Sequence, residues 1–132
     1  MSREGIKTGT EKPYLMAHDL GTTGDKATLW NTEGRLIASV TRSYPFSQPK
    51  PVWAEQDPMD WWRAFIDSTK ELIHITGVEP KDIVGVGFSG QMQGCLPVSK
   101  NGEPIRSSII WMDQRSPQQA DEIKKKIGEE EY

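Results

Sequence analysis

Apolar residues in the first third of the chain come in short runs separated by turn-forming residues. The runs at 14–18, 26–31 and 35–43 contain the apolar and β-branched residues typical of strands, and Thr32-Glu33-Gly34 supplies a turn between the second and third. This pattern predicts a meander of three antiparallel strands. Prolines at 45, 49 and 51 then indicate that residues 43–53 lack regular structure.

A helix is predicted to begin directly after Asp57. Asp57 can cap the helix, Pro58 suits the first helical position, and Asp60 complements the positive end of the helix dipole. Gly77 is expected to end the helix. Residues at helical spacing predict its buried face, namely Trp62, Phe65, Ile66, Thr69, Leu72 and Ile73.

The second half of the chain predicts one more strand, a hairpin and a second helix. The run 83–88 predicts a buried strand, and Asn101-Gly102 is a hairpin signal between 95–99 and 105–110. Apolar residues recur at helical spacing after Pro117, with charged residues on a solvated face. Three meandering strands, a helix and a strand open a ribonuclease-H-like α/β fold with a mixed sheet. A further strand would be expected after the last helix, so we predict that this fold is incomplete here.

Composition and charge indicate a soluble globular chain. The 132 residues are 35% hydrophobic with a net charge of -3, which suits one domain with one core and gives no support for a nucleic-acid or membrane partner. Cys95 is the only cysteine, which predicts an inert buried thiol in a reducing cytoplasm. Neither a signal peptide nor a membrane-spanning apolar stretch is evident. We predict a flexible tail at 1–13 and the domain at 14–132.

The segment His-Asp-Leu-Gly-Thr-Thr-Gly-Asp-Lys, which links the first two predicted strands, carries the candidate chemistry. Asp19 offers a hard oxygen to magnesium or its waters, and Lys26 offers a positive charge. Gly21 lets the backbone approach a phosphate closely, while Thr22 and Thr23 add donors. The segment therefore suits a phosphate and Mg²⁺ site. A tight hairpin whose Asp and Thr side chains satisfy their own backbone is the alternative.

The segment Gly-Val-Gly-Phe-Ser-Gly at 85–90 matches the G-x-G-x-x-G pattern of dinucleotide-binding proteins. In that motif the third glycine opens a helix whose N-terminus receives the pyrophosphate. Here Gly94, Pro97 and Gly102 follow, so no helix is expected and the nicotinamide or flavin interpretation is rejected.

Four segments in order give the chain a specific resemblance. They are Asp19-Leu20-Gly21-Thr22-Thr23-Gly24-Asp25-Lys26, Trp53-Ala54-Glu55-Gln56-Asp57-Pro58 with Trp61-Trp62, Ser89-Gly90-Gln91-Met92-Gln93-Gly94, and Trp111-Met112-Asp113-Gln114-Arg115. The chain resembles the N-terminal part of the FGGY-family carbohydrate kinases, and most of all the xylulose kinases. This resemblance implies half of an actin-like ATPase domain.

The resemblance also assigns roles to individual residues. It implies that Asp19 organises Mg²⁺ beside the ATP phosphates and that Lys26 points toward the transferred phosphoryl group. Cofactor contacts are implied for Gly21, Thr22 and Thr23, and sugar contacts for Met92, Gln93, Trp111 and Asp113.

Two residues depart from the family pattern. Gln93 stands in place of a histidine and alters the hydrogen bonds offered to the sugar. Asp25 replaces a small or apolar residue and is expected to add negative charge beside the phosphate turn, which would weaken ATP binding.

Structural alternatives exist for several of these residues. Asp113 can instead pair with Arg115 or cap the following helix. The tryptophans at 53, 61 and 62 are expected to serve packing, and His18 to be a satisfied core residue.

The implied activity is ATP-dependent phosphoryl transfer to a hydroxyl of xylulose or a related ketopentose or polyol. The implied partners are the sugar, ATP and the remainder of the kinase chain, and an open sheet edge would favour a homo-oligomer. In the family the catalytic base and the adenine-binding domain lie further along the chain. We therefore expect no catalytic residue and no activity in this chain alone. The alternative is a stand-alone, non-catalytic sugar- or phosphate-binding module.

Overall fold

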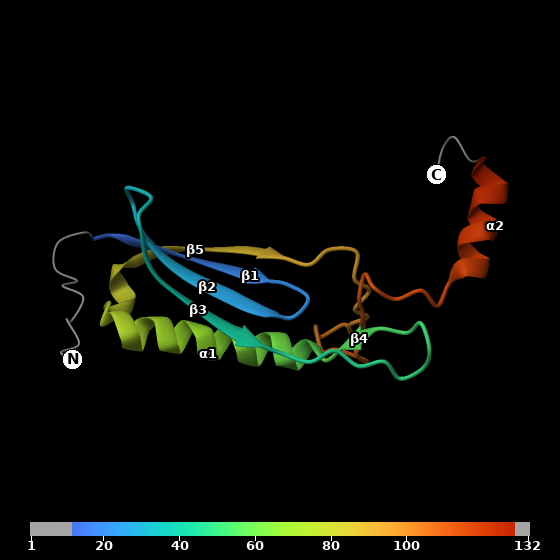
Figure 1. Cartoon of the computed structure of the whole chain (residues 1–132), viewed down its shortest axis with the longest axis horizontal. Coiled ribbons are helices and arrows are strands. Elements are labelled where there is room, and N and C mark those ends of the chain that lie inside the picture. Colours follow the sequence, from blue (N-terminus) through green and yellow to red (C-terminus); the bar gives the residue numbers. More distant parts are fainter. Residues whose placement is uncertain (1–11, 129–132) are drawn as a thin grey trace. The chain divides into compact units, whose positions relative to one another are not determined.

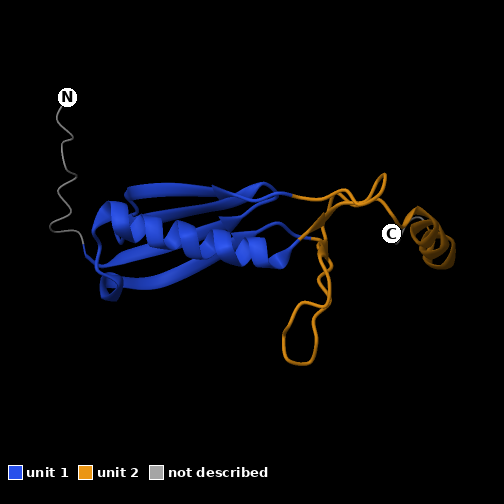
Figure 2. Ribbon diagram, turned by 90° about the horizontal axis from the view of Figure 1, so that it is seen from below, with its two compact units in different colours: residues 1–45, 57–92 blue, residues 46–56, 93–132 orange. Residues whose placement is uncertain are grey.

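The computed structural model describes residues 12–128 of the chain (Figure 1). The chain forms two compact units (Figure 2). Unit 1 comprises residues 1–45 and 57–92, and unit 2 comprises residues 46–56 and 93–132. Most of the predicted tail falls on residues 1–11, which lie outside the described part. No helix within residues 12–128 is long and apolar enough to span a bilayer.

A four-stranded mixed sheet forms the frame of unit 1. Its strands are β1 (Tyr14–Leu20), β2 (Gly24–Asn31), β3 (Leu36–Ser43) and β5 (Ile83–Gly90), in the order β3-β2-β1-β5. β1 pairs antiparallel with β2, β2 pairs antiparallel with β3, and β1 pairs parallel with β5. The predicted meander is therefore confirmed.

Helix α1 (Pro58–Thr76) begins and ends as its sequence predicts. The side chain of Asp57 accepts a hydrogen bond from the backbone N–H of Met59 at 2.9 Å. Gly77 ends the helix with a left-handed φ of 65°, which glycine adopts at little cost, and its N–H donates to the carbonyl of Ile73.

Most of the predicted buried face of α1 is confirmed, because Leu72 is buried and Phe65, Ile66, Thr69 and Ile73 are partly buried. Its buried residues recur every four positions and are mostly small: Ala64, Ser68, Leu72 and Thr76. Small side chains let the helix pack closely against β2 and β3 (Figure 1). Trp62 is 54% exposed, so its predicted burial was wrong, although its ring stacks on that of Phe65 with 5.3 Å between the centroids. Trp53 and Trp61 are partly buried.

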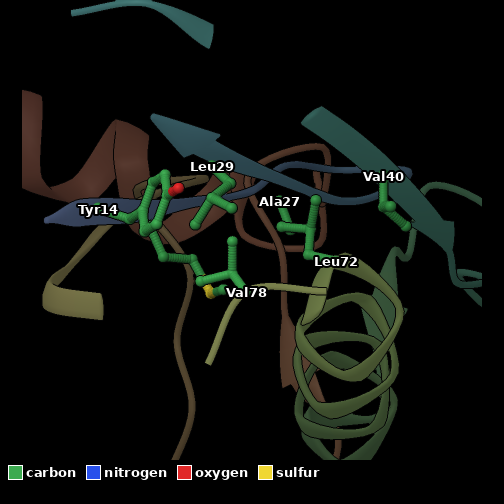
Figure 3. Packing of buried hydrophobic residues seen from close by; sticks show 7 residues of the cluster. Tyr14, Ala27, Leu29, Val40, Leu72 and Val78 are labelled. Carbon is green, nitrogen blue, oxygen red and sulfur yellow. The ribbon is translucent and has the colours of Figure 1, made fainter. Parts of the chain in front are cut away.

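The hydrophobic core lies between α1 and the sheet of unit 1. Figure 3 shows side chains of the strands meeting Leu72 of α1 and Val78, which follows it. The buried cluster consists of Tyr14, Met16, Ala27, Leu29, Val40, Leu72 and Val78.

Strand β5 is not the buried strand that its apolar sequence predicts. Val84 and Phe88 are 63% and 62% exposed. Among the described residues β5 is an edge strand, paired on one side with β1, so its side chains lack neighbours on the other side. A short 3-10 turn, η1 (Pro80–Asp82), leads into β5. Residues 85–90 are extended and open no helix, which agrees with the rejection of the dinucleotide motif.

Unit 2 contains a two-stranded sheet, a hairpin turn and a helix. β4 (Glu55–Gln56) pairs antiparallel with β6 (Ser108–Ile109). The predicted hairpin turn is present, because the N–H of Gly102 donates to the carbonyl of Ser99, but its arms form only isolated bridges. Helix α2 (Pro117–Ile127) follows as predicted. Cys95 is exposed, so the predicted burial of its thiol was wrong.

Candidate functional site

Asp19 and Lys26 are direct cross-strand partners at the end of β1 and the start of β2. Both side chains are exposed, whereas their neighbours His18, Asp25 and Ala27 are buried on the face covered by α1. Because successive strand side chains alternate between faces, Asp19 and Lys26 share the opposite face. They line a cavity of about 460 Å³ together with Ala17, His18, Thr28, Gly87, Phe88 and Ser89.

The turn between these two strands is closed by its own backbone. The N–H of Gly21 donates to the carbonyl of Gly24 at 3.0 Å. A Cβ on Gly24 would lie 2.6 Å from the carbonyl oxygen of Arg42, so only glycine fits this close contact with β3. Thr22 is partly exposed and Thr23 is exposed. The turn therefore has the tight, glycine-dependent backbone that a phosphate cradle requires.

Tyr44, which directly follows β3, forms two hydrogen bonds with this turn, although its sequence context predicts no role for it. Its hydroxyl donates to the carbonyl of Gly21 at 2.5 Å, and its N–H donates to the carbonyl of Thr23 at 3.2 Å. Burial, followed by the charges of Asp25 and Asp19, raises the pKa of Tyr44 to about 12. The hydroxyl thus remains a proton donor at physiological pH.

The side chain of Asp25 is not displayed beside the turn, contrary to prediction. It is fully buried on the α1 face, where Oδ2 accepts from Ser68 Oγ at 2.5 Å and lies 2.9 Å from His18 Nδ1. His18 Nε2 also lies 3.3 Å from Thr69 Oγ1. His18 is therefore the satisfied core residue that the sequence predicts, and Asp25 is its partner.

Met92 follows the end of β5, close to where β1 ends. The parallel register pairs Leu20 with Gly90, and the N–H of Gln91 donates to the carbonyl of Leu20 at 2.9 Å. Met92 itself is 78% exposed. The carboxyl ends of parallel strands are where α/β sheets commonly bind ligands, so this edge of unit 1 has the geometry of a binding edge.

In unit 2, Asp113 is held by hydrogen bonds to both of its carboxylate oxygens. Oδ1 accepts from the backbone N–H and Nε of Arg115 at 3.0 and 2.8 Å. Oδ2 accepts from the guanidinium of Arg115 at 2.6 Å and from the N–H of Ala54 at 2.7 Å. The bond from the Arg115 side chain, more than any other contact, holds the pKa of Asp113 far below its ordinary value. These contacts realise the pairing alternative for Asp113.

Arg115 connects the second and fourth sequence segments. Its guanidinium lies over the ring of Trp53 at 3.8 Å from the centroid and donates to Glu55 Oε1 at 2.8 Å. Arg106 donates to the same Glu55 oxygen. Sequence reasoning missed this cluster, because its members are about 60 residues apart.

The remaining candidate substrate residues of unit 2 are accessible. Trp111 is 54% exposed, and Gln93 is exposed with a left-handed φ of 61°. A positive φ is uncommon for a residue other than glycine and occurs often at functional sites.

The structure therefore divides the candidate residues between the two units. Unit 1 brings together Asp19, Lys26 and the turn that joins their strands, and it also contains Met92. Gln93, Trp111 and Asp113 belong to unit 2. Within residues 12–128, no three His, Cys, Asp or Glu side chains gather as a metal-binding group. Asp19 is thus a single carboxylate, which suits a cation that is also held by phosphates and water.

Known proteins share sequence and fold with this chain. Residues 14–132 match the model of the N-terminal domain of the FGGY family of carbohydrate kinases. A xylulose kinase of Bacillus subtilis is 35% identical over 88% of this chain and 23% of its own length. A glycerol kinase of Caldanaerobacter subterraneus is 36% identical over 86% of this chain and 23% of its own length. The crystal structure of a xylulose kinase from Rhodospirillum rubrum superposes with a TM-score of 0.82 at 26% identity, covering 89% of this chain and 24% of that one.

These matches confirm the ribonuclease-H-like, actin-like ATPase fold that the order of elements predicts. The chain belongs to the FGGY family of carbohydrate kinases, and residues 14–132 match the family's N-terminal domain. It spans about 23% of the length of the curated relatives it matches.

Proposed function

We propose that the protein containing this chain is an ATP-dependent sugar kinase that transfers the γ-phosphoryl group to a hydroxyl of a ketopentose or polyol. The observation that carries the proposal is the cross-strand pair of Asp19 and Lys26, set at the two ends of a glycine-dependent turn. A cytoplasmic location fits the need for ATP.

Each group of the turn has a distinct role in this proposal. Phosphoryl transfer depends on positioning and on neutralising the charge of the phosphates. The backbone N–H groups of Thr22 and Thr23 bind phosphate oxygens, and Gly21, whose own N–H donates to the carbonyl of Gly24, lets the backbone approach the phosphate closely. Lys26 supplies positive charge on the face that it shares with Asp19. The general base and the adenine site are supplied by other parts of the protein.

Mg²⁺ fits the donor set at Asp19. The carboxylate is exposed at a strand end and lines the cavity, and magnesium commonly binds one or two carboxylates together with phosphates and water. When bound, the ion would neutralise phosphate charge.

Gln93 and Trp111 of unit 2 are proposed to contact the sugar. Met92 of unit 1 is a separate candidate, proposed from its position after β5. Gln93 offers a donor and an acceptor without charge, and Trp111 offers an exposed apolar face. The four protein hydrogen bonds on the Asp113 carboxylate favour a role in holding the segment of Trp111 over a direct sugar contact. Xylulose is the first candidate substrate, and glycerol is the second because glycerol kinases are similarly related.

Steady-state kinetics of the full-length protein test this proposal. Asp19→Ala should lower kcat at least about a hundredfold, because metal-supported charge stabilisation contributes several kcal/mol. Asp67→Ala, which removes an exposed carboxylate from α1, is the matched control and should leave kcat unchanged. Unchanged turnover of Asp19→Ala at saturating Mg²⁺ would refute the assignment of this turn.

A substrate panel of xylulose, ribulose, xylitol and glycerol identifies the sugar. The 132-residue chain alone should show no turnover with any of them. Tight sugar binding by this chain without any turnover of the full-length protein would instead support the binding-module alternative.

A further inference from the structure

Three carbonyl oxygens of the turn after β1 accept hydrogen bonds from donors inside unit 1. The carbonyl of Gly21 accepts from the hydroxyl of Tyr44, that of Thr23 accepts from the N–H of Tyr44, and that of Gly24 accepts from the N–H of Gly21. Tyr44 thus supplies two of these three bonds, and it is 8% exposed.

Fixing a carbonyl also fixes the N–H of the same peptide group. The peptide unit is planar and trans, so the Thr22 N–H points away from the Gly21 oxygen, and the Gly24 N–H points away from the Thr23 oxygen. An anion cradle requires N–H groups toward the ligand and carbonyl oxygens away from it, because the carbonyl oxygens repel phosphate. The Tyr44 hydroxyl therefore controls which end of the Gly21–Thr22 peptide group faces an anion.

We propose that Tyr44 is a positioning residue for nucleotide phosphates, acting through the orientation of the Gly21–Thr22 peptide group. The inference rests on the proposed function of this turn. The tyrosine touches no substrate in this arrangement. Its contribution is to hold the binding geometry before the nucleotide arrives, which lowers the cost of ordering the turn on binding.

The test compares Tyr44→Phe with the wild-type full-length enzyme. This substitution keeps the buried ring and removes the donor to Gly21, so the KM for ATP should rise about tenfold while the KM for the sugar stays within about twofold. Tyr14→Phe is the matched control, because Tyr14 is also buried on the same sheet but lies at the opposite end of β1. The control should leave both KM values unchanged.

Two further measurements separate positioning from general stability. Calorimetric titration with Mg-ADP should show the same loss of affinity without any need for turnover. Replacing Tyr44 by para-aminophenylalanine restores a donor at the ring position and should restore nucleotide affinity.

Each outcome bears on one of the two proposals. A wild-type enzyme that neither turns over nor binds Mg-ADP would overturn the proposed function, and the role of Tyr44 with it. An active wild-type enzyme whose Tyr44→Phe variant keeps its KM for ATP and its Mg-ADP affinity would overturn the role of Tyr44 alone. A Tyr44→Phe variant that no longer folds, or an aminophenylalanine variant that folds without recovering affinity, would also overturn it.

Discussion

Replacing Asp25 with alanine should destabilise unit 1 more than replacing a charged residue on its surface. The buried carboxylate accepts from Ser68 Oγ at 2.5 Å and lies 2.9 Å from His18 Nδ1. Its removal leaves both groups buried without this acceptor. Each hydrogen bond to a charged group contributes about 1.5–3 kcal/mol, and breaking a buried polar pair costs about 3–5 kcal/mol. We expect Asp25→Ala to lower the free energy of unfolding by about 3 kcal/mol.

A second variant separates this pairing from simple loss of volume. Asp25 Oδ1 has no hydrogen-bond partner among residues 12–128, so the buried carboxylate is only partly satisfied. Replacing a buried polar pair by apolar residues of similar size is often neutral or stabilising. The double variant His18→Leu/Asp25→Val should therefore lie within about 1 kcal/mol of wild type, although each single change is costly.

Urea denaturation of the 132-residue chain, followed by far-UV circular dichroism, measures these differences. Asp67→Ala on the exposed side of α1 is the control and should change the free energy of unfolding by less than about 0.5 kcal/mol. An equal loss of unfolding free energy in Asp25→Ala and Asp67→Ala would contradict the role of the buried carboxylate. So would a double variant that is as unstable as the sum of its single changes.

Two further changes test other parts of the fold. The pKa of Asp113 is depressed in the folded chain, so its bonds with Arg115 stabilise the fold above the ordinary carboxyl pKa and are lost as pH falls. Melting temperatures of Arg115→Gln should therefore decline less than those of wild type between about pH 5 and pH 2, and a parallel decline would contradict this. Gly24→Ala places a Cβ 2.6 Å from the Arg42 carbonyl and should cost about 2 kcal/mol in urea denaturation. Gly87→Ala, with no atom within 4 Å of its Cβ, is the control, and equal losses in the two variants would refute the steric argument.

Local signals predicted the elements of unit 1 well. The start of α1 depends on Asp57 and Pro58, whose effects act within one helical turn. The meander depends on short alternating runs and a turn at Gly34. The candidate turn could also be recognised, because Asp19 and Lys26 lie seven residues apart in the sequence.

Burial and long-range contacts were harder to predict. Asp25 continues the alternation of Ala27 and Leu29, but the predicted strand began at Lys26, so Asp25 was assigned to the turn. Its partners in the fold, His18 and Ser68, come from another strand and from a helix. The hydrogen bonds from Tyr44 to the turn depend on the register of β2 with β3, and the sequence pattern does not determine this register.

The exposure of β5 had a different cause. Its apolar residues predict burial, but burial depends on what lies beside the strand. Val84 and Phe88 have no strand beyond them in the described chain.

The interleaving of the two units along the chain has a consequence for the order of folding. β4 and β6 pair with Glu55 opposite Ile109, so this pairing closes the long loop between these two residues. Closing that loop before unit 1 has folded carries an entropic cost. Tyr44 is bonded to Gly21, and Gln91 is bonded to Leu20, so both strands that lead from unit 1 into unit 2 end beside the same turn. Folding of unit 1 therefore brings the ends of β3 and β5 together, and this shortens the loop that the β4–β6 pairing has to close. We expect the β4–β6 pair to form late, and its amides to gain protection after those of β1 and β2 in pulse-labelled hydrogen exchange.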